Sequence, residues 1–142
     1  MIIRECITSD EISSTFSVMR QLRPHLQADN YLAVINALQN TEKYRLVGLF
    51  NDTGKCIAVA GFRVMRTLFL NGEAQLYIDD LVTDEAERSN GHGCTLLDWL
   101  YAESKKLHCR GVSLDSGMQR TKAHAFYRQQ GFMDIALHFQ KN

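Results

Sequence analysis

The order of apolar and polar residues divides the first third of the chain into one strand and two helices. Ile2–Ile7 is apolar and β-prone, and residues 8–10 (Thr-Ser-Asp) then offer N-cap side chains for a helix that runs towards Leu22. Pro24 interrupts that helix. Apolar residues recur at helical spacing over residues 28–38, which predicts a second helix.

The middle of the chain has the pattern of an antiparallel meander. Tyr44–Phe50 and Cys56–Met65 are strand-like runs joined by an Asn-Asp-Thr-Gly turn, which predicts a hairpin. A second hairpin is expected next, because Asn71-Gly72 suits a type I′ turn between Leu68–Leu70 and a long strand over Glu73–Val82.

The last third alternates helices and strands. After Gly93, one helical face is apolar and the last turns carry Lys105 and Lys106, which suit the negative end of a helix dipole. A buried strand over 111–115, a helix over 121–130 and a terminal strand over 132–139 complete the order β-α-α-β-β-β-α-β-α-β. This order predicts an α/β (α+β) fold with a mixed sheet.

Length and charge narrow the classes of protein. A chain of 142 residues with 45% hydrophobic and 23% charged residues fits one domain spanning residues 1–142. Lys plus Arg equal Asp plus Glu at 16 each, so no global field attracts nucleic acid or an anionic membrane. Any anion must therefore be bound by a local site.

The first residues of the chain, its apolar runs and its cysteines indicate where the protein is located in the cell. Residues 1–5 lack the layout of a signal peptide, and no apolar run approaches the roughly 18 residues of a membrane span. The four cysteines form no Cys-x-x-Cys pair and are expected to be buried thiols. We therefore expect a cytoplasmic protein without a membrane segment.

A glycine-rich turn lies between the Glu73–Val82 strand and the helix that follows. Over Arg88–Gly93 (Arg-Ser-Asn-Gly-His-Gly), such a turn can direct backbone N–H groups at a phosphate, and the helix dipole favours negative charge. Arg88 adds a cation, and Ser89, Asn90 and Thr95 add hydrogen-bonding groups. Neither a Walker loop nor a dinucleotide fingerprint is present.

Two motifs together resemble those of the GNAT superfamily of acyl-CoA N-acyltransferases. Arg88, Gly91 and Gly93 match its Arg-x-x-Gly-x-Gly loop, and residues 123–132 match its late Ala-x-x-Phe-Tyr-x-x-x-Gly-Phe helix. The resemblance implies a mixed, mostly antiparallel, twisted sheet of six to seven strands with about four helices. It also implies a gap between residues 73–82 and 111–115, into which the pantetheine arm of acetyl-CoA runs.

The resemblance also implies the residues that hold acetyl-CoA as the acyl donor, with no metal. Backbone groups of Leu81, Val82 and Thr83 would pair with pantetheine, and the loop would cradle the pyrophosphate. The remaining expected contacts come from the loop, from the start of the helix that follows it and from the late helix. They are Arg88, Ser89, Asn90, Gly91, His92, Gly93, Cys94, Thr95, Ala123 and Phe126.

Acid and base candidates follow from the chemistry of acetyl transfer. Tyr127 sits at the position of the family's acid, and a phenol of pKa about 10 is protonated at neutral pH; the alternative is that it only packs its helix on the sheet. Asp79 and Asp80 are candidate bases, expected on opposite faces of a strand, with Asp79 preferred. Some family members instead carry a catalytic Glu where this chain has Gln75.

Other polar residues complete the candidate site. Asp115 and Arg120 follow a predicted strand and are expected to contact the acceptor. The side chain of His92 is expected to face solvent, and neither it nor His124 has the partners of a metal site. The acceptor pocket would come from Arg20–Leu38 and Arg66–Asn71, which carry no readable motif.

Three functions are compatible with these residues. The first is an N-acetyltransferase that moves an acetyl group from acetyl-CoA to a primary amine of a small molecule or protein. The second is a non-catalytic acyl-CoA sensor, which is favoured because this chain has Gln75 where some family members carry a catalytic Glu. The third, a toxin-like enzyme acting on aminoacyl-tRNA, is disfavoured by the zero net charge. An exposed final strand would support a homodimer.

Overall fold

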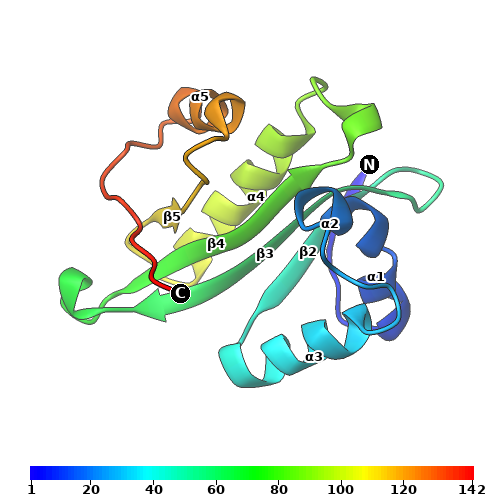
Figure 1. Ribbon diagram of the computed structural model, residues 1–142, viewed down its shortest axis with the longest axis horizontal. Coiled ribbons are helices and arrows are strands. Elements are labelled where there is room, and N and C mark those ends of the chain that lie inside the picture. The colour runs from blue at the N-terminus through cyan, green and yellow to red at the C-terminus, as the bar shows by residue number, and fades with distance from the viewer.

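The computed structural model describes residues 1–142 and contains one five-stranded sheet with helices on both faces. The strands follow one another in the sheet in chain order; β1 to β4 are antiparallel and β5 is parallel to β4. Figure 1 shows the long β3–β4 ribbon at the centre. The strands are β1 (Ile2–Glu5), β2 (Arg45–Phe50), β3 (Cys56–Arg66), β4 (Ala74–Thr83) and β5 (Val112–Leu114).

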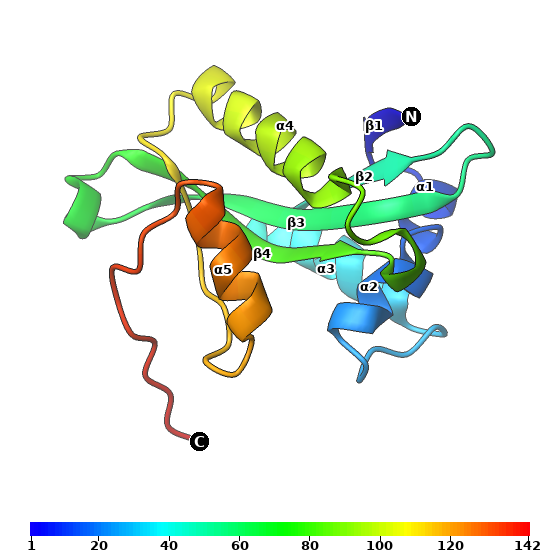
Figure 2. The ribbon, with the colours of Figure 1, turned by 90° about the horizontal axis from the view of Figure 1, so that it is seen from above.

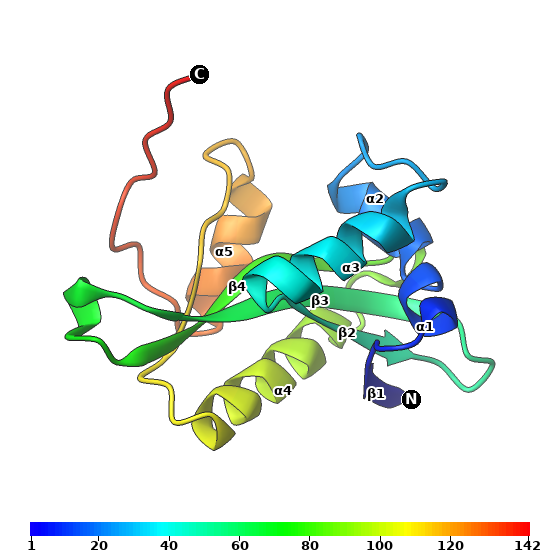
Figure 3. The same cartoon turned by 90° about the horizontal axis from the view of Figure 1, so that it is seen from below.

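Five α-helices cover the two faces of the sheet. Figures 2 and 3 show α4 on one face and the first three helices on the other. The helices are α1 (Ser9–Ser13), α2 (Phe16–Leu22), α3 (Tyr31–Glu42), α4 (His92–Lys106) and α5 (Thr121–Gln129). Aromatic residues of α5 pack into the same apolar cluster as α4, so α5 belongs to the face of α4.

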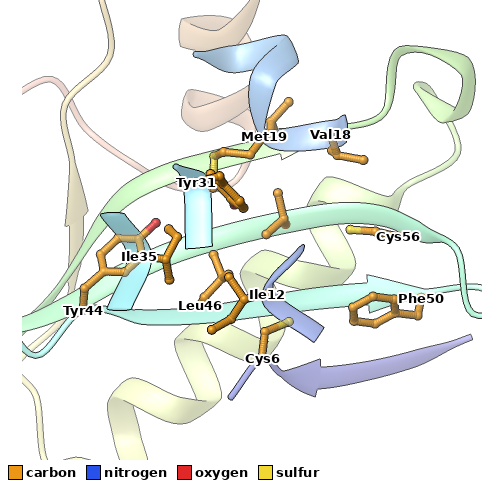
Figure 4. Close-up of a cluster of buried hydrophobic side chains, with 12 residues drawn as sticks. Cys6, Ile12, Val18, Met19, Tyr31, Ile35, Tyr44, Leu46, Phe50 and Cys56 are labelled. Carbon is orange, nitrogen blue, oxygen red and sulfur yellow. The ribbon is translucent and has the colours of Figure 1, made fainter. Parts of the chain in front are cut away.

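Two apolar clusters hold these layers together. Figure 4 shows the cluster in which Ile12, Met19 and Ile35 of the first three helices pack on one face of the sheet. Leu96 and Leu100 of α4 pack on the other face. Because both faces are covered, β2 is buried along almost its whole length, which is the usual state of a strand inside a layered α/β fold.

The first predicted helix is divided in two. Thr8 caps α1 with a capping box, in which the Glu11 N–H donates to Thr8 Oγ1 (3.2 Å) and the Thr8 N–H donates to Glu11 Oε1 (2.9 Å). The helix ends at Ser13, because the buried Thr15 hydroxyl bonds the Ile12 carbonyl (2.7 Å) and the Tyr31 hydroxyl (2.8 Å). Three helices therefore lie between β1 and β2, where two were predicted.

The second hairpin differs from the prediction at its tip. Leu68–Leu70 forms a 3-10 turn capped by Thr67 and not a strand, so β3 pairs directly with β4. Asn71 and Gly72 have positive φ, as the Asn-Gly pair predicts. The reason for the difference is that β3 is already long enough to pair with β4 up to Arg66–Ala74.

The predicted terminal strand over 132–139 is wrong, and the sheet has five strands where six to seven were expected. After Gly131 the chain continues without regular structure or strand partner. Arg128 and His138 tie it to nearby carboxylates of Asp134 and Asp115. Its alternating apolar residues remain exposed, since a strand pattern forms a strand only where an edge pairs with it.

Candidate active site

The two central strands separate along their length and leave one edge of β4 free. β5 pairs with β4 only over Leu76–Ile78, whereas β3 pairs with β4 as far as Thr83. From Asp79 onward the backbone of β4 therefore has no strand on its β5 side. This is the gap that was predicted between residues 73–82 and 111–115.

A polar cleft lies at this gap and draws residues from four segments. Leu22 and Arg23 come from the end of α2, residues 78–81 from β4, Leu114 and Asp115 from the end of β5, and Arg120 and Tyr127 from α5 and its N-cap. Four predicted site residues thus meet with Asp79, namely Asp80, Asp115, Arg120 and Tyr127. Gln75 and the hairpin tip at 66–71 do not line the cleft.

The expectation that Asp79 and Asp80 lie on opposite faces of β4 is wrong. The register shifts between Gly61 and Phe62, so that Gly61 pairs with Asp80 and Phe62 pairs with Ile78, which leaves Asp79 as an extra residue. Such a β-bulge interrupts the alternation of side chains. Both carboxylates consequently point to the face covered by α2 and α3.

Each of these carboxylates is held by an arginine from another element. Arg63 binds Asp79 through two nitrogens, with Nε 2.9 Å from Oδ2 and Nη2 2.8 Å from Oδ1. Arg23 Nε donates to Asp80 Oδ1 (2.9 Å), and the Tyr44 hydroxyl donates to Asp80 Oδ2 (2.8 Å). Each oxygen of Asp80 therefore accepts one hydrogen bond, from a different residue in each case, while both oxygens of Asp79 accept from one guanidinium.

Tyr127 reaches the cleft from the opposite face. It packs edge-on against Phe126 (5.5 Å between ring centroids) and Phe132 (5.7 Å). Burial raises the pKa of Tyr127 above the usual 10.0, and the positive charge of Arg120 partly opposes this shift. The phenol is therefore protonated at neutral pH and can donate a proton into the cleft.

Asp115 and Arg120 border the cleft beyond β5. Asp115 lies 3.1 Å from His138 Nδ1. Burial, together with the negative charge of Asp115, raises the pKa of Tyr77 to about 12. Arg120 has no carboxylate within ion-pair distance. Its charge is therefore available to a bound molecule.

The glycine-rich loop forms the start of α4, as predicted. Gly91 is the N-cap with φ +80°, Ser89 has φ +68°, and no side chain caps the helix. N–H groups in the first turn of a helix lack an acceptor within the helix. Arg88 Nε donates weakly to the Thr83 carbonyl (3.5 Å), which places its guanidinium beside the end of β4.

Other loop side chains bond to the protein itself. Asn90 donates to the Glu87 carbonyl, and Thr95 donates to the Gly91 carbonyl. The prediction that the His92 side chain faces solvent is wrong, because it is only 13% exposed and lies 3.9 Å from a Glu87 carboxylate oxygen. The physical reason is that α4 begins at this residue and turns the ring towards the preceding 3-10 turn (Glu85–Glu87).

Gly93 brings the two sequence motifs into contact. A Cβ at this position would lie 3.3 Å from Phe126 Cζ and 3.6 Å from Thr83 Oγ1. Next to it, Cys94 Sγ lies 3.2 Å from Gln130 Oε1. The loop, the free end of β4 and α5, with Ala123 in its first turn, therefore form one continuous surface that leads to Tyr127.

Comparisons with known proteins identify this arrangement. The family model described as Acetyltransferase (GNAT) family matches residues 9–132. The chain belongs to this family. It is 34% identical over 140 residues to the uncharacterized N-acetyltransferase YhdJ of Bacillus subtilis (strain 168), covering 98% of this chain and 96% of the relative.

Solved structures confirm the GNAT fold. An acetyltransferase of Trypanosoma brucei has a TM-score of 0.80 at 24% identity, and a transcriptional regulator of Bacillus halodurans C-125 has 0.87 at 19%. Each comparison covers 99% of this chain and 98% of the other. Enzymes of the GNAT family generally use acetyl-CoA.

The chain shows neither a metal centre nor a membrane-spanning helix. No group of three or more His, Cys, Asp and Glu side chains is arranged to hold a metal ion. None of the helices has the length and apolarity needed to cross a bilayer. The cytoplasmic location stays a prediction.

Three residues that hold the carboxylates were not singled out from the sequence, namely Arg23, Arg63 and Tyr44, although Arg23 lies in the range Arg20–Leu38 expected to supply the acceptor pocket. They belong to neither motif and lie 57, 16 and 36 positions from the carboxylates they bind. Since no alternation or spacing links such distant positions, the chain offers no local signal for them.

Proposed function

We propose that residues 1–142 form one acetyltransferase domain, which transfers an acetyl group from acetyl-CoA to a primary amine of a small molecule or protein. The observation that carries this proposal is the close approach of Phe126 and Thr83 to Gly93, where an added Cβ would meet both side chains. It joins an anion-binding loop, an unpaired strand edge and a protonated phenol in one path. These are the parts that binding and cleavage of an acyl-CoA thioester require.

The chain offers suitable groups for each part of acetyl-CoA. First-turn N–H groups after Gly91 and the guanidinium of Arg88 suit the pyrophosphate, with Ser89, Asn90 and Thr95 nearby. The unpaired edge at Leu81–Thr83 suits the amides of pantetheine. When bound, acetyl-CoA supplies the thioester carbonyl that an amine attacks.

The acid and base roles follow from the two sides of the cleft. The neutral amine forms the N–C bond as the C–S bond breaks, and the departing thiolate takes a proton from Tyr127. The ammonium proton passes to a carboxylate, directly or through water. We place Asp80 ahead of Asp79 here, because Arg63 occupies both oxygens of Asp79.

A non-catalytic acyl-CoA-binding module is the second candidate. The observation that favours it is that the oxygens of both carboxylates already accept hydrogen bonds from arginines, so an acceptor amine would have to compete for them. Gln75, where some relatives carry a catalytic Glu, lies outside the cleft. A sensor would bind acetyl-CoA and release no thiol when amines are added.

We also propose that two copies associate through the segment after α5. Met133, Ile135, Leu137 and Phe139 are 70–86% exposed on alternate positions, and β5 at the sheet edge has a partner on one side only. Exposed apolar faces of this kind commonly mark an interface. Light scattering should give the dimer mass, and a monomer at all concentrations would overturn this.

The test of the proposed function has two steps. Titration calorimetry with acetyl-CoA should show one site per chain, and a folded protein without binding heat would overturn both candidates. A thiol-release screen across primary amines then separates them. Amine-dependent release indicates the enzyme, and binding without release indicates the sensor.

A further inference from the structure

One arginine outside both motifs is bonded to the β4 bulge at two consecutive residues. Arg23 is the C-cap of α2, and its Nε donates to Asp80 Oδ1 (2.9 Å) while its Nη2 donates to the backbone carbonyl of Asp79 (3.1 Å). The Asp80 side chain is 16% exposed. A single guanidinium thus fixes both the side chain and the main chain at the place where the strand leaves its regular register.

Asp80 has a second anchor on the other side. The Tyr44 hydroxyl donates to Asp80 Oδ2 (2.8 Å), and the Tyr44 ring is buried against Gly61, where no side chain intervenes; Figure 4 shows this ring in the core cluster. Burial and the charge of Asp80 raise the pKa of Tyr44 well above its usual value. The hydroxyl therefore stays protonated and donates.

Other cations near the cleft have different contacts. Arg63 binds Asp79, and Arg120 has no carboxylate partner. Arg20, on the same helix as Arg23, lies over the Phe16 ring (5.8 Å) and forms no ion pair with a carboxylate. Glu42 of α3 reaches Asp79 only through Arg63, so the direct hydrogen bonds from the helices on this face to the β4 bulge come from Arg23.

We propose that Arg23 is a positioning residue for acetyl transfer, which holds Asp80 and the Asp79 carbonyl where they receive the acceptor amine. The proposal rests on the proposed function. The planar guanidinium matches two acceptors at once, whereas a lysine ammonium at this position would satisfy one of them. As a consequence, the segment between α2 and α3 is fixed to the edge of the cleft.

Steady-state kinetics of Arg23→Gln test this role. The matched control is Arg110→Gln, because Arg110 pairs with the exposed Glu73 and does not line the cleft. A misplacement of about 1 Å costs roughly 100-fold, so kcat/KM for the amine should fall about 10- to 100-fold in Arg23→Gln. The Kd for acetyl-CoA should not change, because the glycine-rich loop lies elsewhere. Arg23→Lys should recover part of the loss, and Arg110→Gln should match wild type.

A double-mutant cycle shows whether Arg23 acts through Asp80. If it does, Arg23→Gln adds little to the loss caused by Asp80→Asn, because coupled residues are not additive. A full, undiminished loss in the Asp80→Asn background would overturn the proposal. Normal kinetics of Arg23→Gln would also overturn it while leaving the acetyltransferase function intact.

Hydrogen exchange gives a readout that needs no acceptor. Loss of the Arg23 contacts should speed amide exchange at Asp80 and Leu81 in Arg23→Gln and leave the first turn of α4 unchanged. Unchanged exchange at the bulge would contradict the positioning role. If Arg23→Gln shows this faster exchange while the wild-type protein binds acetyl-CoA and acetylates no amine, the proposed function is refuted instead.

Discussion

Gly61→Ala should strongly destabilise the protein, because the space beside this glycine is filled by Tyr44. A Cβ at position 61 would lie 1.6 Å from Tyr44 Oη and 2.1 Å from Cζ. The buried ring must therefore move and give up its hydrogen bond to Asp80. Gly61→Ala thus disturbs the core and the cleft together.

The size of the effect follows from three contributions. Overpacking a core costs about 1–3 kcal/mol, and loss of a hydrogen bond to a charged group costs about 1.5–3 kcal/mol. Removal of a glycine from a strand returns about 0.5–1 kcal/mol. Since the ring relaxes partly, we expect a net loss of about 2–4 kcal/mol in the free energy of unfolding.

Urea unfolding followed by far-UV circular dichroism and by Trp99 fluorescence measures this loss. Gly111→Ala is the matched control, because a Cβ there meets nothing within 4 Å and the backbone is not in the left-handed region. The control should be neutral or slightly more stable than wild type. Equal unfolding midpoints for the two variants would refute the packing of Tyr44 against Gly61.

Three further predictions concern the acid, the loop and the response to pH. Tyr127→Phe should lower kcat about 100-fold or more with unchanged acetyl-CoA affinity, and because burial raises its pKa, wild type should lose no rate through this phenol below pH 10.0; an undiminished rate would remove it as the acid. Arg88→Ala should weaken acetyl-CoA binding in calorimetry roughly 10-fold, whereas Arg66→Ala at the hairpin tip should not, and equal affinities would place the pyrophosphate elsewhere. The Ala86 N–H lowers the pKa of Asp84 below 3.8, so Asp84 stabilises the fold above that pH and loses this effect as the pH falls through its folded value. The stability gap between wild type and Asp84→Asn should therefore narrow in acid, and a gap independent of pH would contradict this.

Local patterns predicted the parts of the fold that depend on neighbouring residues. The cap at Thr8, the positive φ at Asn71 and the start of α4 beside Gly91 all depend on a few consecutive positions. The GNAT resemblance was confirmed by the family match over residues 9–132. Tyr127 lies in the cleft as its motif implied.

Features that depend on distant pairings could not be predicted in this way. The bulge at Asp79 arises from the way in which β3 and β4 pair. The alternation of side chains along β4 alone predicted that Asp79 and Asp80 lie on opposite faces, which is wrong. Arg23, Tyr44 and Arg63 reach the carboxylates through tertiary contacts. The segment over 132–139 has the pattern of a strand but no edge of the same chain pairs with it.

Mass spectrometry of an amine acceptor incubated with acetyl-CoA labelled in the acetyl group tests the acetyltransferase function most directly. The labelled acetyl group should appear on the amine nitrogen, with one free thiol released per acetylated amine, and Tyr127→Phe should slow both together. Acetyl-CoA binding without any labelled amine, or thiol release without acetylated product, would contradict it.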